Sequence, residues 1–174
     1  LEGQRTLLLS ISHELRSPLT RARLNAELLP ESPEREALLR DLGQMRDLIA
    51  NLLESERLAA LYDYQILDTP PEPAFDDLAR LSAELCGAPI GLITFVDRDR
   101  VWLKARVGLE VQSMPRPLAI CSVAFQQDEP LIVSDLALDP RFAAHPLVAV
   151  PDGLRFYAGV PLRTEGGHAL GVLC

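Results

Sequence analysis

Apolar residues recur at intervals of three and four positions through the first 60 residues, which is the spacing of one face of an α-helix. One apolar stripe consists of Leu8, Ile11, Leu15, Leu19, Ala22, Ala26 and Leu29. A second stripe consists of Leu38, Leu42, Met45, Ile49 and Leu52. Between the stripes, Ser32 suits a helix N-cap and Pro33 suits the first helical position. The pattern predicts two long helices joined by a short turn, which fold back into an antiparallel hairpin.

Two helices alone cannot bury both apolar stripes against each other. The hydrophobic effect therefore favours the association of two hairpins into a dimeric four-helix bundle. We expect residues 1–58 to form a homodimer through this hairpin.

The remainder of the chain, residues 59–174, contains most of the proline and glycine and several β-branched apolar runs. The pattern predicts helices at 57–66, 73–86 and 118–126, and strands at 90–96, 101–107, 131–133, 156–162 and 169–174. Hairpin turns are expected at Asp97–Arg100 and at Gly166–Gly167. The fold class is therefore α+β, in which a helical hairpin precedes an antiparallel sheet flanked by helices.

The charge balance of the chain is acidic, with 25 acidic and 17 basic residues. A nucleic-acid-binding surface needs a basic footprint, so we expect no nucleic-acid partner. No apolar run approaches the roughly 18 residues of a membrane span, and no signal segment opens the chain. We expect a cytoplasmic chain, cut from a longer protein that can carry a membrane anchor before Leu1.

His13 lies in the middle of the first predicted helix. At about 100° per residue, His13 lies about 200° from both Ile11 and Leu15, so it faces away from the apolar stripe. An exposed neutral imidazole can act as a nucleophile when a base takes or orients its other ring proton, and the adjacent carboxylate of Glu14 suits that role. Ser17 lies one turn later on the same face and can hydrogen-bond a phosphoryl oxygen.

A proline follows within the same helical pattern. Pro18 removes the hydrogen bond to the carbonyl of Glu14, at a cost of about 3 kcal/mol in a helix interior. We expect the helix to bend or unwind locally next to His13, which suits a part that moves between states.

The eight residues Ser12–Leu19 resemble the H-box of sensor histidine kinases, and residues 1–58 resemble the dimerisation and phosphoacceptor hairpin of that family. The resemblance implies that His13 accepts the γ-phosphoryl group of ATP and passes it to an aspartate of a response-regulator receiver domain. It implies that Glu14 assists as base and that Ser17 serves the phosphatase step, although Thr or Asn is common at that position. The ATP-binding kinase domain has no counterpart after residue 60, so ATP would be supplied through a separate domain and this chain alone should be inactive.

The second part of the chain is similar to GAF sensory domains of bacterial signalling proteins. The similarity rests on residues 57–72, 75–79, 95–97, 139–142 and 155–162. It implies that residues 59–174 form a GAF-like domain that is incomplete at its C-terminal end. Such domains hold a small ligand or a partner copy against one face of the sheet.

Several residues of the second part invite a functional interpretation. Cys121 invites interpretation as a bilin attachment site, since a pocket thiol can add covalently to a chromophore. The phytochrome-like pattern has a histidine after that cysteine, whereas Ser122 and Val123 follow here, so a small buried hydrophobe is the better interpretation. His145 and His168 have no second ligand at metal spacing, which favours solvated or capping roles, and no metal site is predicted.

Other residues have structural explanations. Phe95, Trp102 and Phe156 lie at strand positions and are predicted to be core. Asp135 and Asp139 lack the alternation of a calcium loop and are predicted to stabilise turns. The chain has three cysteines, Cys86, Cys121 and Cys174. An odd number without metal-type spacing suggests free thiols and not a set of disulfides.

Two functions remain open at this point. The first is a two-component sensor histidine kinase fragment with a phosphoacceptor at His13. The alternative is a non-catalytic GAF sensor or dimerisation module whose H-box is a relic. The hairpin precedes the GAF-like part, and residues 52–58 are expected to continue the second helix, so that strain or rotation can pass along it.

Overall fold

The computed structural model describes the backbone of residues 2–174 and the side chains of Glu14, Leu15 and residues 17–174. The chain divides into two compact units, Leu1–Ala59 and Ala60–Cys174. Each unit is described by itself below.

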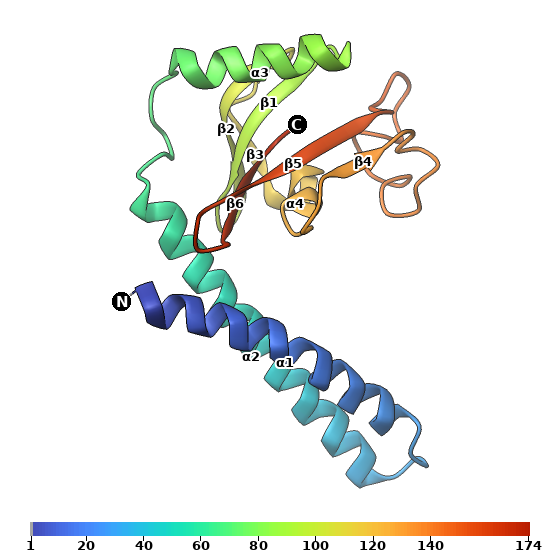
Figure 1. Ribbon diagram of the computed structural model, residues 1–174. Helices are drawn as coiled ribbons and strands as arrows, with labels where there is room; N and C mark the ends of the chain where they lie inside the picture. The colour runs from blue at the N-terminus through green and yellow to red at the C-terminus, as the bar shows by residue number, and fades with distance from the viewer. Residues whose placement is uncertain (1) are drawn as a thin grey trace. The chain divides into compact units, whose positions relative to one another are not determined.

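The first unit is the predicted helical hairpin. Helix α1 spans Glu2–Glu27, and helix α2 begins at Pro33 and ends at Asp63 (Figure 1). The backbone N–H of Arg35 donates to the hydroxyl of Ser32 at 3.2 Å, which confirms Ser32 as the cap of α2. The guanidinium of Arg35 also donates to the carbonyls of Ala26 (3.2 Å) and Glu27 (3.1 Å), which lack partners within α1 because α1 ends there. One side chain at the start of α2 thus fixes the end of α1.

Two details of the helices differ from the predictions. Helix α1 continues through Pro18 without interruption, because the loss of one backbone hydrogen bond leaves the others of the helix in place. The helical segment predicted at 57–66 is continuous with α2, as expected from residues 52–58, but it ends earlier than predicted, at Asp63. No sequence signal for a helix end precedes that point, because neither glycine nor proline lies between residues 44 and 69.

The second unit is built on a six-stranded antiparallel sheet of order β3-β2-β1-β6-β5-β4. The strands are β1 (Gly91–Val96), β2 (Arg100–Val107), β3 (Ser113–Pro115), β4 (Leu131–Val133), β5 (Tyr157–Arg163) and β6 (Ala169–Leu173). The helices are α3 (Pro73–Cys86), the short 3₁₀ helix η1 (Arg116–Leu118) and α4 (Cys121–Ala124). The predicted α+β architecture is confirmed.

The prediction of one helix at 118–126 is wrong, because the structure has the two short helices η1 and α4 in this region. Ala119 is extended, with φ −107° and ψ 118°, and separates η1 from α4. Strand β3 was not predicted, because three residues are too few to show an alternating pattern.

Both faces of the sheet are covered, so every residue of the central strand β1 is buried. On one face Ile93 and Phe95 pack in a cluster with Ala79 of α3 and with Leu61 at the end of α2. On the other face Leu92 and Val96 belong to a larger cluster that includes α4. The second cluster also contains Leu136, Phe142 and Val148 from the long segment between β4 and β5. Gly91 allows α3 to lie close to the sheet, because a Cβ at that position would come within 2.3 Å of the Ala79 carbonyl oxygen.

A single buried ammonium group holds the segment before α3 against the sheet. Lys104 of β2 is the only lysine of the chain, and its side chain has no exposed surface. Its Nζ donates to the hydroxyl of Thr69 (2.7 Å), the carbonyl of Pro70 (2.8 Å) and the carboxylate of Glu72 (2.5 Å). The charge is therefore fully hydrogen-bonded, as a buried cation requires.

Candidate functional site

The predicted phosphoacceptor segment lies in the middle of α1. The side chains of Glu14 and Ser17 are exposed and, three residues apart on one helix, lie on the same side of it. Pro18 is exposed as well. The His13 side chain lies outside the described residues, so its orientation stays a prediction.

A groove between the two helices begins at Leu19, the last residue of this segment. Its volume is about 400 Å³, and it is lined by Leu19, Thr20 and Arg23 of α1 and by Leu42, Arg46, Ile49, Ala50 and Leu53 of α2. Leu19, Leu42 and Ile49 belong to the predicted apolar stripes. The two arginine side chains, which pair with Glu27 and Asp47, are half exposed or more.

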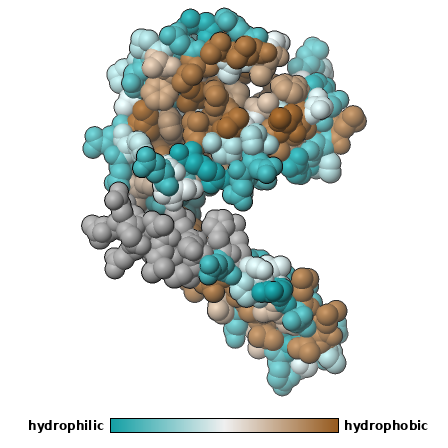
Figure 2. Space-filling model, in the orientation of Figure 1, coloured by the Kyte–Doolittle hydropathy of each residue, from teal (hydrophilic) through white to brown (hydrophobic). Residues whose placement is uncertain are grey.

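The apolar faces of the hairpin are not covered within one chain. Ala26 is buried, but Leu29 is 50% exposed, Met45 50% and Leu52 44%. Apolar side chains are correspondingly visible on the surface of the hairpin (Figure 2). Exposed apolar side chains along the two predicted stripes are typical of an interaction surface.

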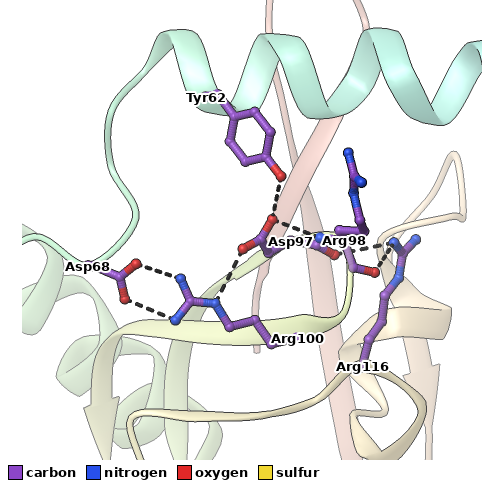
Figure 3. Close-up of polar contacts among 6 residues, drawn as sticks. All are labelled: Tyr62, Asp68, Asp97, Arg98, Arg100 and Arg116. Carbon is purple, nitrogen blue, oxygen red and sulfur yellow. Dashed lines mark hydrogen bonds and ion pairs between the residues drawn. The ribbon is translucent and has the colours of Figure 1, made fainter.

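In the second unit a polar network connects the last turn of α2 to the turn between β1 and β2 (Figure 3). The hydroxyl of Tyr62 donates to Oδ1 of Asp97 at 2.8 Å. The same carboxylate accepts the backbone N–H of Arg98 (2.8 Å) and Nε of Arg100 (3.2 Å). Arg100 in turn donates to both oxygens of Asp68, at 3.0 and 2.5 Å.

The geometry accounts for the acidity of these carboxyl groups. Partial burial alone would raise the pKa of Asp97, but the hydrogen bonds from Arg98, Tyr62 and Arg100 lower it below its ordinary value. The Arg100 guanidinium lowers the pKa of Asp68 in the same way. Both carboxylates are therefore charged at neutral pH and hold Arg100 between the segment after α2 and the sheet.

This network predicts an acid-dependent stability. Because the folded-state pKa of Asp97 is below its unfolded value, its contribution is present above about pH 4 and is lost as pH falls through the folded pKa. Asp97→Asn should lower the free energy of unfolding by about 1 kcal/mol at pH 7, the usual value of such hydrogen bonds. The difference from the parent chain should shrink below about pH 4.

Urea denaturation of both chains at a series of pH values measures this difference. Asp99→Asn is the matched control, since Asp99 is an exposed aspartate in the same turn. A difference between the parent and Asp97→Asn that stays constant from neutral to acid pH would contradict the assignment.

The structure also bears on the roles predicted for Cys121, Asp135 and Asp139. Cys121 is 6% exposed and lies in the core, as predicted. Asp139 accepts the backbone N–H of Arg141 (2.9 Å) and Asp135 that of Ala137 (2.9 Å), which confirms their turn roles. Within the side chains that the structure describes, no group of His, Cys, Asp or Glu is arranged to hold a metal ion. A membrane-crossing helix is likewise not found in that part of the chain.

One prediction about the aromatic residues was wrong. Phe156 is 49% exposed, because β5 begins one residue later and Tyr157 takes the core position. Of the two predicted roles for the histidines, Nδ1 of His145 has the capping role, since it accepts the backbone N–H of Leu147 at 3.2 Å. His168 is buried, which excludes the solvated role for that residue. Phe95 and Trp102 are core residues, as predicted.

Sequence reasoning also missed two clusters. Tyr62 and Asp97 lie 35 residues apart, and Cys121 and Cys174 lie 53 residues apart. No short-range pattern marks such pairs, because only the sheet brings their segments together.

Comparison with known families defines the class of each part. Residues 70–174 match the GAF domain, and residues 4–61 match the His Kinase A (phospho-acceptor) domain. The chain belongs to the GAF domain family and carries a histidine-kinase phosphoacceptor hairpin before that domain.

One curated relative is the cyclic di-GMP phosphodiesterase PA2567 of Pseudomonas aeruginosa, which is 34% identical over 121 residues, or 70% of this chain. The chain spans about a fifth of that protein's length, since the match covers 21% of it. Among solved structures, the GAF domain of a phosphoenolpyruvate-protein phosphotransferase from Coxiella burnetii is 18% identical with a TM-score of 0.47, covering 70% of this chain and 76% of that one. The free methionine-R-sulfoxide reductase of Neisseria meningitidis is 23% identical with a TM-score of 0.46, covering 68% and 70%.

Proposed function

We propose that the chain is the phosphoacceptor and sensory part of a two-component histidine kinase, with His13 as the phosphorylated residue. The observation that carries the proposal is the motif Ser12–Leu19 on a hairpin of the phosphoacceptor family, where the neighbouring Glu14 and Ser17 are exposed. An exposed position is required, because both an ATP-binding domain and a receiver domain must reach the same imidazole.

The proposed reaction has two phosphoryl transfers. In the first, a ring nitrogen of His13 forms a bond to the γ-phosphorus of ATP while the bond to the bridging oxygen breaks and ADP leaves. Glu14 accepts the proton of the other ring nitrogen, which keeps the attacking nitrogen nucleophilic. In the second, a receiver-domain aspartate attacks the phosphorus, the N–P bond breaks, and His13 returns to its starting state. Ser17 orients a water for the phosphatase step.

The test is labelling by a histidine-kinase ATP-binding domain supplied as a separate protein. The chain, incubated with that domain and γ-labelled ATP, should acquire phosphate that is stable in base and lost in acid, as a phosphohistidine is. The label should then move to a receiver domain. Labelling that survives acid, or no labelling with any ATP-binding domain of this class, would contradict the proposal.

The homodimer is the second element of the proposal. The exposed apolar face of α2, which contains Met45 and Leu52, would be covered by a second copy of the hairpin. Met45→Glu places a carboxylate in that interface and should raise the dimer dissociation constant at least about tenfold, equivalent to about 1.4 kcal/mol. Sedimentation velocity over a range of concentrations measures this.

Asn51→Glu is the matched control, because it adds the same charge at an exposed position of α2 outside the stripe. The dimer assignment fails if the parent chain sediments as a monomer throughout, or if both substitutions act equally.

The alternative is a non-catalytic GAF sensor with a relic H-box. It is favoured by the cyclic di-GMP phosphodiesterase relative, whose activity belongs to a different reaction class. In that case the GAF domain would bind a small ligand or a second copy while His13 stays unmodified. Native mass spectrometry after rapid purification would reveal a retained ligand, and the labelling assay above separates the two functions.

A further inference from the structure

Two thiols meet inside the second unit. Cys121 is the first residue of α4, and Cys174 follows directly after β6. Their Sγ atoms lie 3.3 Å apart, and both cysteines are free. The atoms need to approach by only about 1.3 Å to reach covalent distance.

The positions of both residues are fixed by the backbone. The N–H of Cys174 donates to the carbonyl of Leu92 (2.9 Å), and the N–H of Leu92 donates to the carbonyl of Cys174 (2.6 Å), so Cys174 continues the pairing of β6 with β1. The carbonyl of Cys121 accepts the N–H of Phe125 at 2.9 Å within α4. The packing of α4 against the sheet thus holds the two cysteine backbones in fixed positions, at which their Sγ atoms are 3.3 Å apart.

The environment makes the two thiols unequal. The hydrogen bond with Cys174 lowers the pKa of Cys121 below its ordinary value, against the effect of burial. The pKa of Cys174 is raised by its hydrogen bond to Cys121 and by burial. Burial also raises the pKa of Tyr157, which lies in the same core cluster and so stays a neutral phenol. The contact between the two sulfurs thus favours the thiolate on Cys121, and the thiolate is the nucleophilic form of cysteine.

We propose that Cys121 and Cys174 are a redox-active dithiol, which hydroperoxides oxidise to a reversible intramolecular disulfide between α4 and β6. The Cys121 thiolate attacks the terminal oxygen of the hydroperoxide and the O–O bond breaks, so Cys121 becomes a sulfenic acid. The hydroxide or alkoxide that leaves takes up the proton that Cys121 lost on ionising, and departs as water or an alcohol. The sulfur of Cys174 then attacks the sulfur of Cys121, and water leaves. With hydrogen peroxide, two thiols and one peroxide become one disulfide and two waters, and a dithiol reductant reverses the change.

The disulfide would have a structural consequence within the GAF domain. It would close a loop that contains β4, β5 and the long segment between them, and it would tie α4 to the central strands of the sheet. The inference goes beyond the proposed phosphotransfer function and does not depend on it, since all of its residues lie in the second unit.

The experiment uses the 174-residue chain with Cys86→Ser, because Cys86 is exposed on α3 and would otherwise form links between chains. The chain is treated with hydrogen peroxide, alkylated, and analysed by intact mass and peptide mapping. We expect the loss of two hydrogens from the intact mass, protection of both remaining thiols from alkylation, and a Cys121–Cys174 cross-linked peptide. Dithiothreitol should restore both thiols.

Two single variants test the order of the steps. With Cys174→Ser, peroxide should leave a sulfenic acid on Cys121 that dimedone traps, and no cross-link can form. With Cys121→Ser, burial still raises the pKa of Cys174, so after peroxide treatment dimedone should label Cys174 more slowly than it labels Cys121 in Cys174→Ser, and again no cross-link can form. Circular dichroism of each variant confirms that it is folded. Peroxide treatment that leaves both thiols of the folded parent free, or adds oxygen without a cross-link, overturns the proposal.

Discussion

His13→Gln is expected to abolish the acid-labile phosphate that the chain acquires from γ-labelled ATP and a separate ATP-binding domain. Glutamine occupies a similar volume but has no ring nitrogen that can form the N–P bond, so label should fall to background, not merely decrease. The helix itself should be unaffected, because His13 and glutamine both fit a helical position. Phosphorimaging after base and acid treatment measures the effect.

Two further variants make this result specific. His145→Gln is the matched control, since it changes a histidine of the second unit that only orients the Leu147 amide, and it should label like the parent chain. Glu14→Gln keeps the nucleophile but removes the base, so labelling should slow by about 10²-fold, the lower range for general base catalysis. Equal labelling of the parent chain and His13→Gln would show that another residue accepts the phosphoryl group.

Leu61→Ala is expected to lower the free energy of unfolding of the second unit by about 2–5 kcal/mol. Leu61 lies in the last turns of α2, has no exposed surface, and packs in the cluster that contains Phe95 and Trp102. Truncation removes its buried carbons and leaves a cavity that the sheet cannot close. Urea denaturation followed by the fluorescence of Trp102, the only tryptophan, reports on this cluster.

Leu85→Ala provides the control for Leu61→Ala. Leu85 lies on α3 and is 78% exposed, so the same truncation should change the unfolding free energy by less than about 0.5 kcal/mol. If Leu61→Ala is equally mild, the end of α2 is not an integral part of the GAF core.

The last turn of α2 belongs to the second unit. Helix α2 is one element from Pro33 to Asp63 and completes the phosphoacceptor hairpin. In its last turn Leu61 packs in the GAF core, and the hydroxyl of Tyr62 donates a hydrogen bond to Asp97. A change in the sheet or in the turn after β1 would act directly on this last turn. The Asp97 network and the Cys121–Cys174 pair lie at opposite ends of the same strands, since Asp97 follows β1 and Cys174 pairs with Leu92 near its start.

The sequence by itself determined the local structure of this protein. Ser32 and Pro33 mark the start of α2, and the helix at Pro73–Cys86 and five of the six strands follow from apolar periodicity and turn residues. The family motif around His13 is also a local feature, readable because eight contiguous residues carry it. The tertiary structure alone decided which distant side chains meet: Tyr62 with Asp97, Arg100 with Asp68, and Cys121 with Cys174. It also decided that Phe156 is exposed and Lys104 buried, because burial depends on strand register and on packing against other elements, which short-range patterns do not record.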